Sequence, residues 1–153
     1  MNSSIMDSLA GNLIQLLPLL HSTVINLDDF NTDADLGRAH YEILACLDSV
    51  EYAVPMTGVS KAMNISKPYL TTLTDRLISK DYIERVPEPA DRRVIKIALT
   101  SKGRALIREH FAMMRKAVVE KLAALNASET EQLASALLTV TAILGKFKGV
   151  KRQ

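Results

Sequence analysis

The sequence has little cysteine and lacks the long apolar runs and basic N-terminus that are typical of membrane and secreted proteins. Its 153 residues include one cysteine, Cys46, and no tryptophan. A single cysteine excludes a disulfide within the chain and fits a reducing cytoplasm. The N-terminal apolar run has no basic residue before it and is interrupted by Gln15 and Pro18. We therefore expect neither a secretion signal nor a membrane span, and we predict a cytoplasmic protein.

Motifs for catalysis, metal binding and cofactor binding are also missing from the sequence. It contains no glycine-rich phosphate loop and no His-Glu-x-x-His motif, and its three histidines lie in separate predicted elements. Asp28 and Asp29 are adjacent in the acidic segment 28–35, but no third ligand follows at helical or hairpin spacing. That pattern favours a solvated loop over a metal site. We predict no enzyme, no cofactor and no metal.

Charge is distributed unevenly along the chain. Residues 1–60 hold eight acidic and one basic residue, a net of −7, whereas residues 61–104 hold ten basic and five acidic residues, a net of +5. Residues 105–153 add eight basic and four acidic residues, a net of +4, which brings the chain to its total of +2. A basic middle segment is the pattern expected for a surface that neutralises nucleic-acid phosphates.

The most informative stretch is a predicted helix that begins after Ser66. Ser66 is a favourable N-cap, and Pro68 falls in the first turn, where its missing N–H costs little. Leu70, Leu73 and Leu77 recur at helical spacing and are expected to face a core. The opposite face is short and polar, which a helix needs in order to approach base edges in the major groove. A plain solvated helix face is the alternative.

The flanking segments favour the DNA-binding interpretation. Before the helix, residues 59–65 predict a short apolar helix that ends at Asn64, a residue type that tolerates the left-handed conformation of a tight turn. After it, residues 82–86 and 94–99 predict two strands joined by a loop with Asp91, Arg92 and Arg93 at its tip. An arginine pair on a protruding hairpin suits the negative potential of the minor groove.

Taken together, ISKPYLTTLTDRL, YIER, the loop DRR and LTSKG resemble the MarR family of bacterial winged-helix transcription regulators. The specific part is the wing signature, which is Asp91, Arg93, Leu99-Thr100 and then Gly103 at the start of the next helix. The sequence departs from the family pattern at Asp81, where glycine is usual. The resemblance implies a mainly helical (α+β) winged helix-turn-helix with a two-stranded wing.

The resemblance also implies roles for individual residues. The recognition helix would run from Ser66 to Arg76, Arg93 would enter the minor groove, and Asp91 would orient it. Residues 67, 71, 72 and 76 would contact the major groove or its flanking phosphates. The predicted DNA-binding residues are Ser66, Lys67, Pro68, Tyr69, Thr71, Thr72, Arg76, Arg85, Asp91, Arg92 and Arg93.

Apolar residues outside the winged segment predict dimerisation. Residues 5–27, where Pro18 can kink the helix, residues 101–124 and a last helix carry stripes at spacings of three and four. A capping box of Ser128 and Glu131 would begin the last helix. A monomer offers nothing obvious to bury these stripes, one of which includes Ile107. We predict a homodimer with residues 1–35 and 101–153 as dimerisation region and residues 36–100 as DNA-binding domain, the whole forming one structural domain.

The predicted partners are a pseudo-palindromic DNA duplex, a second copy of the chain and a small-molecule effector, with no membrane. By resemblance, the function is a ligand-responsive repressor. An effector pocket would lie between the winged core and the dimer helices, lined by His40, Tyr41, Phe111, Met113 and Met114. Two alternatives stay open. One is a winged-helix module that binds a protein and never reads DNA. The other is an oxidant sensor through Cys46, although its position beside Leu47 favours burial as a small apolar residue.

Overall fold

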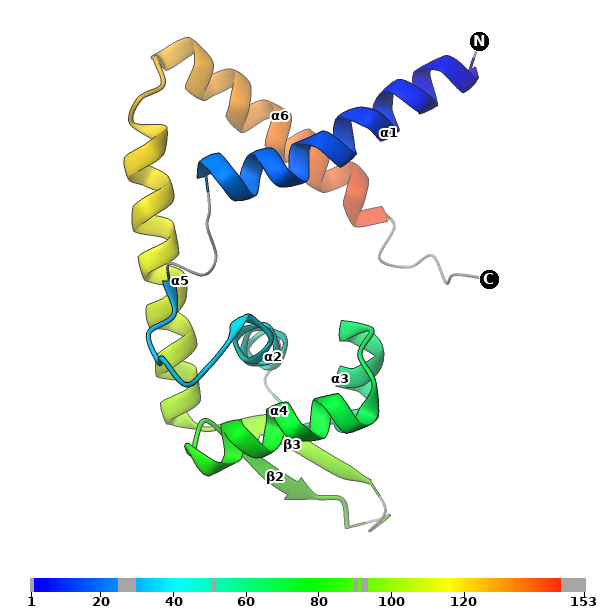
Figure 1. Cartoon of the computed structure of the whole chain (residues 1–153), viewed down its shortest axis with the longest axis vertical. Helices are drawn as coiled ribbons and strands as arrows, with labels where there is room; N and C mark the ends of the chain where they lie inside the picture. Colours follow the sequence, from blue (N-terminus) through cyan, green and yellow to red (C-terminus); the bar gives the residue numbers. More distant parts are fainter. Residues whose placement is uncertain (1, 25–29, 51, 90, 92–93, 147–153) are drawn as a thin grey trace. The chain divides into compact units, whose positions relative to one another are not determined.

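The computed structural model describes residues 2–24, 30–50, 52–89, 91 and 94–146, which are mostly helical (Figure 1). The chain divides into two compact units, Met1–Arg115 and Lys116–Gln153. The first unit holds helix α1 (Asn2–Leu19), one turn of π-helix (Leu20–Val24), α2 (Arg38–Asp48), β1 (Val54–Pro55), α3 (Met56–Met63), α4 (Lys67–Ser79), β2 (Ile83–Pro87) and β3 (Ile95–Leu99). Helix α5 (Ser101–Leu122) starts in the first unit and ends in the second, which also holds α6 (Ala127–Gly145).

The three strands form one antiparallel sheet, in which β2 and β3 make up the wing. Strands β2 and β3 pair antiparallel from Ile83 opposite Leu99 to Pro87 opposite Ile95. Strand β1 pairs with the other edge of β3, where Val54 lies opposite Ile97, so the order is β1-β3-β2. The predicted mainly helical winged helix-turn-helix is confirmed. The two predicted strands exist, but the sheet has a third, short strand that the sequence prediction lacked.

Helix α4 is anchored as its leucine spacing predicts. Leu70, Leu73 and Leu77 are all buried. They belong to a core that α2, α3, α4, the sheet and the first turns of α5 share. Asn64 takes the left-handed conformation with φ 53° and ψ 42°, and thereby turns the chain sharply from α3 into α4. The core as a whole consists of Leu36, Tyr41, Ile43, Leu44, Leu47, Val59, Leu70, Leu73, Leu77, Tyr82, Ile83, Ile97, Leu106 and Ile107.

Three sequence-based details were wrong, and a fourth was right only in part. The helix predicted over residues 5–27, with a possible kink at Pro18, is not one α-helix: α1 ends at Leu19 and continues as a π-helical turn to Val24, and residues 25–27 lie outside the described residues. Helix α2 begins at Arg38 and not at Leu36, which is a buried core residue before the helix. The capping box of α6 is Asn126 with Glu129, two residues earlier than predicted. Ile107 is fully buried in the winged core and cannot belong to a partner-facing stripe.

Two helices expose rows of large apolar side chains. In α1, Ile14 and Leu17 are each 71% exposed, and in α6 Leu138 is 75% exposed. Burying such side chains stabilises an association by roughly 25 cal/mol per Å² of apolar surface. Among the described residues, no helix is both long and apolar enough to cross a bilayer.

Candidate nucleic-acid interface

The exposed face of α4 collects most of the side chains predicted to bind DNA. The Ser66 hydroxyl accepts a hydrogen bond from the Tyr69 N–H at 3.4 Å and so caps the helix. Pro68 is the second residue of α4, and Tyr69 is 49% exposed. The structure brings together on this face the exposed residues Ser66, Lys67, Pro68, Tyr69, Thr71, Thr72, Asp75 and Arg76. A polar face on a helix held by buried leucines can enter a major groove without unfolding its support.

The two exposed threonines of α4 hold their hydroxyl groups against the helix backbone. The Thr71 hydroxyl donates to the Lys67 carbonyl at 3.0 Å, and the Thr72 hydroxyl donates to the Pro68 carbonyl at 3.2 Å. Each bond satisfies the polar atom within the helix, so the threonine methyl group is available to apolar contacts such as a thymine methyl. Lys67 and Arg76 are the cationic side chains on the same face.

Arg85 projects from β2 and forms an ion pair with Asp75 of α4, with Nη2 2.7 Å from Oδ1. Both side chains are about half exposed. The pair fixes the guanidinium beside the recognition helix, which keeps a basic group at the junction of helix and wing. Asp75 has no role among the predicted DNA-binding residues, because no short spacing links it to a residue ten positions later.

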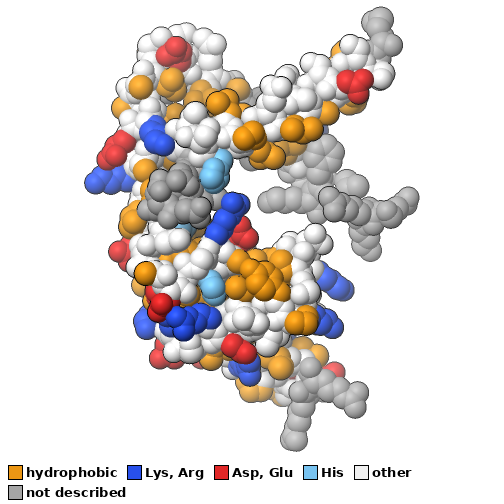
Figure 2. Space-filling view, in the orientation of Figure 1, with side chains coloured by type: hydrophobic (Ala, Val, Ile, Leu, Met, Phe, Trp, Pro, Cys, Tyr) orange, Lys and Arg blue, Asp and Glu red, His pale blue; other side chains and the backbone are white. Residues whose placement is uncertain are grey.

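The C-terminal turn of α4 carries a second group of ion pairs that sequence reasoning missed. Lys80 lies 2.8 Å from carboxylate oxygens of both Asp33 and Asp35, and Arg76 lies 3.2 Å from Asp35. The hydrogen bond from Lys80 is the main cause that lowers the pKa of Asp33 and of Asp35 below the ordinary value, and it raises the pKa of Lys80. Both carboxyl groups are therefore charged at neutral pH. Figure 2 shows Lys and Arg side chains beside Asp and Glu side chains over the winged part.

The wing is described only in part. Asp91 is exposed, and its carbonyl accepts a hydrogen bond from the Val94 N–H at 2.9 Å. Arg92 and Arg93 lie outside the described residues, so the predicted contact between Asp91 and Arg93 stays a prediction. Ile95, at the base of the wing, is 45% exposed although its neighbour two positions on, Ile97, is fully buried.

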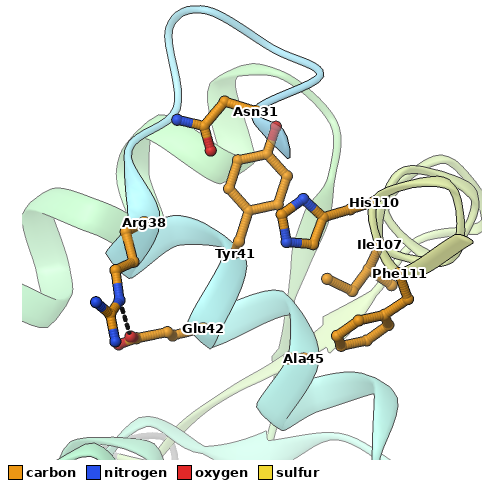
Figure 3. Close-up of a pocket in the computed structure, with 8 residues that line it drawn as sticks. All are labelled: Asn31, Arg38, Tyr41, Glu42, Ala45, Ile107, His110 and Phe111. Atoms are coloured by element: carbon orange, nitrogen blue, oxygen red, sulfur yellow. Dashed lines mark hydrogen bonds and ion pairs between the residues drawn. The ribbon is translucent and has the colours of Figure 1, made fainter. Parts of the chain in front are cut away.

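A hollow of about 100 Å³ lies between α2 and the first half of α5 (Figure 3). Tyr41 stacks on His110 with ring centroids 4.3 Å apart, and the His110 Nδ1 lies 2.8 Å from the Phe30 carbonyl oxygen. Arg38 and Glu42 form an ion pair at the rim. The residues that line the hollow are Asn31, Arg38, Tyr41, Glu42, Ala45, Ile107, His110 and Phe111.

Two of the five predicted pocket residues, Tyr41 and Phe111, line this hollow. His40 lines a different surface depression, together with Tyr69 and Leu73 of α4. The His40 Nδ1 accepts a hydrogen bond from the Gly37 N–H, and burial lowers the pKa of its imidazole. Met113 and Met114 follow Phe111 along α5 and line neither depression.

Cys46 is half-buried in α2, five residues after Tyr41 and beside the buried Leu47. Oxidant sensing through it stays a prediction. Within the described parts of the chain, no three histidine, cysteine, aspartate or glutamate side chains are grouped as a metal site would require.

A short helix, a left-handed turn, a second helix with an anchored polar face and an antiparallel hairpin together define a winged helix-turn-helix protein. The MarR family model matches residues 36–95, which cover α2 to the start of β3. Over these residues the chain is similar to the MarR family. The members of this family are transcription regulators and not enzymes, which agrees with the prediction that the chain has no catalytic activity.

Individual relatives agree with this assignment. Over 96 residues the chain is 26% identical to the multiple antibiotic resistance protein MarR of Escherichia coli, and the match covers 63% of this chain and 65% of the relative. Over 79 residues it is 32% identical to the HTH-type transcriptional regulator YpoP of Bacillus subtilis, which covers 52% of this chain and 55% of the relative. The matched parts thus span less than two thirds of either relative.

Solved structures extend the likeness to most of the chain. A crystal structure of a mutant of MarR from E. coli superposes with a TM-score of 0.70 at 25% identity, covering 85% of this chain and 94% of that one. The same mutant complexed with operator DNA superposes with a TM-score of 0.59 at 24% identity and covers 85% of this chain and 91% of that one.

Proposed function

We propose that this protein is a homodimeric transcription regulator in the cytoplasm that binds a pseudo-palindromic DNA duplex. The observation that carries the proposal is the polar face of α4, on which Lys67, Thr71, Thr72 and Arg76 are all exposed above three buried leucines. The relative from E. coli in complex with operator DNA supports it, since its fold is the same. The DNA-binding set is the one predicted from the sequence, with Arg92 and Arg93 included.

A dimer accounts for the exposed apolar rows of α1 and α6. Two recognition helices related by a two-fold axis would meet successive major grooves about one helical turn, roughly 34 Å, apart. The dimerisation region would be built from residues 1–35 and 101–153, beside a DNA-binding part of residues 36–100. Sedimentation equilibrium of the whole chain tests this, because a monomer at micromolar concentration would contradict the proposal.

We further propose that a small-molecule effector relieves repression. The hollow beside Tyr41 and His110 supplies an aromatic wall and a charged rim, which fits a small planar anion or neutral aromatic molecule better than a large ligand. Such a molecule would lower DNA affinity only through its preference for a conformation whose recognition helices are wrongly spaced. Phe111→Ala, which removes a half-exposed side chain from the lining of the hollow, should then abolish the effector response while DNA binding without effector persists.

The experiment that tests DNA binding is fluorescence anisotropy with the duplex upstream of the chain's own coding region, across a salt series. The slope of log affinity against log salt should be steep, about −0.9 for each neutralised phosphate. Lys67→Ala should weaken binding and reduce the slope by about one unit for each bound subunit. Lys121→Ala, which removes an equal charge from an exposed position in α5, is the matched control and should bind as the wild type does.

The wing supplies a second arm of the same experiment. Arg93→Ala should lose affinity if the arginine enters the minor groove. No binding at low salt, or equal binding by all variants, would instead favour the alternative of a winged-helix module that docks on a protein.

A further inference from the structure

The segment of residues 30–36, here called the acidic strap, joins the recognition helix to the rest of the winged core. Its two carboxylates hold the C-terminal end of α4. Asp33 accepts hydrogen bonds from Lys80 at 2.8 and 2.9 Å and from the Tyr82 hydroxyl at 2.9 Å. Asp35 lies 2.8 Å from Lys80 and 3.2 Å from Nη2 of Arg76. The strap thus contacts both cations of the last turns of this helix.

The strap is itself held in place by buried and half-buried groups. The Asp33 N–H donates to the Tyr41 hydroxyl at 3.0 Å, and the same hydroxyl lies 3.2 Å from the Thr32 hydroxyl. Leu36, at the end of the strap, is 2% exposed and therefore anchored in the core. A carboxylate fixed by its own backbone gives up less conformational entropy when it pairs with an arginine than one on a free loop would. The strap is therefore able to hold Arg76 in one orientation.

The charges in this group cancel, since two carboxylates face two cations. Lys80 is largely covered, with 22% of its side chain exposed, whereas Arg76 is 46% exposed. Arg76 also lies one turn after Thr72 on the polar face of α4. A DNA phosphate can therefore reach Arg76 but must compete with Asp35 for its guanidinium. A carboxylate and a phosphate are recognised by the same planar fork of donors.

We propose that Asp35 is a positioning residue for DNA binding, which holds Arg76 away from the phosphate backbone and so limits the affinity of the recognition helix. This inference rests on the proposed function, because it concerns the binding of duplex DNA by α4. Lys80 does not share the role, since it keeps both of its bonds to Asp33 when Asp35 is neutral. The strap thus lowers DNA affinity through one side chain, Arg76.

The expected effect follows from the strength of exposed ion pairs. Asp35→Asn should tighten binding to a duplex about twofold to fivefold for each bound subunit, which is the usual range for one exposed pair. Asp35→Glu, which keeps the negative charge, should bind the duplex with the same affinity as the wild type. Removal of a negative charge near DNA also has a general effect through space, so the gain must be traced to Arg76.

A double-mutant cycle makes that distinction. Binding of a fluorescein-labelled duplex of unrelated sequence is measured by anisotropy for the wild type, Asp35→Asn, Arg76→Gln and the double variant, each at three salt concentrations. The matched control is Asp48→Asn, which changes the net charge equally and also breaks an ion pair between an aspartate and an arginine, that of Asp48 Oδ1 with Arg104 at 2.8 Å. The melting temperature of every variant is recorded by circular dichroism.

The proposal requires that Asp35→Asn gain affinity in the presence of Arg76, lose most of that gain in the Arg76→Gln background, and exceed Asp48→Asn. An equal gain in both backgrounds would overturn it, because Asp35 would then act only through net charge. Weaker binding by Asp35→Asn with an unchanged melting temperature would also overturn it. If the wild type binds no duplex at low salt, the proposed function itself fails, and that outcome is separate from the two above.

Discussion

Gly103 is expected to be the least replaceable residue at the junction between the wing and α5. A Cβ atom added there would lie 1.9 Å from the Tyr82 carbonyl oxygen and 3.0 Å from Cδ2 of Leu99. The same carbonyl accepts hydrogen bonds from the Thr100 N–H at 3.2 Å and from the Thr100 hydroxyl at 3.1 Å. Gly103→Ala must therefore displace backbone that is already fixed by two bonds, and not the end of a flexible side chain.

The size of the effect can be worked out from these contacts. Cβ atoms essentially never approach another heavy atom closer than 3.0 Å, so the Tyr82 carbonyl would have to move by about 1.1 Å. Overpacking of this kind costs about 1–3 kcal/mol, and one lost hydrogen bond adds about 1 kcal/mol. Alanine has a better helix propensity than glycine, which offsets about 1 kcal/mol of this loss of stability. The free energy of unfolding should fall by about 1–3 kcal/mol, and the melting temperature by about 2–12 °C.

Urea unfolding followed by circular dichroism measures this difference. Gly58→Ala is the matched control, because its added Cβ would meet only Cγ1 of Val54, at the ordinary distance of 3.6 Å. That variant should be as stable as the wild type or more stable by about 0.5–1 kcal/mol. The reasoning is refuted if Gly103→Ala unfolds within about 0.5 kcal/mol of the wild type, a difference typical of an unconstrained surface site.

Three further predictions concern stability. Asp81 has φ 63°, a left-handed conformation that costs a side-chain-bearing residue about 1 kcal/mol. Asp81→Gly should therefore unfold at equal or higher urea concentration than the wild type, and Asp81→Val at lower. Leu77→Ala, at a fully buried site, should cost about 2–5 kcal/mol in the same assay, and a loss below 1 kcal/mol would contradict the packing described. The third prediction concerns pH: the bond from Lys80 holds the pKa of Asp33 below 3.8 and that of Lys80 above 10.5. Stability from this pair should be lost as pH falls below about 3.8 and as it rises above about 10.5. Asp33→Asn should weaken both dependences, because only the bond of Lys80 to Asp35 then remains, and unchanged pH profiles of melting temperature would speak against the pair.

Local sequence signals were sufficient for the recognition helix. Its N-cap, its proline in the first turn and its three leucines act within a few residues of one another, so helix α4 and its buried side could be predicted without any tertiary contact. Asn64 was predictable for the same reason, since the left-handed turn depends on the residue type at one position. The polar face of α4 then follows from geometry, because the residues between the leucines must point the other way.

The remaining features depended on contacts between distant parts of the chain. Strand β1 has only two residues, one of them proline, and exists because β3 offers it an edge at Ile97. The strap reaches α4 across 47 residues from Asp33 to Lys80, and no local pattern links these side chains. Burial of Ile107 was equally hidden, because a helical stripe looks the same whether it faces a core or a partner. Thus the sequence by itself determined which side of α4 is polar, through periodicity, whereas the tertiary structure decided which of its cations are held by carboxylates, because that depends on where a distant loop is packed.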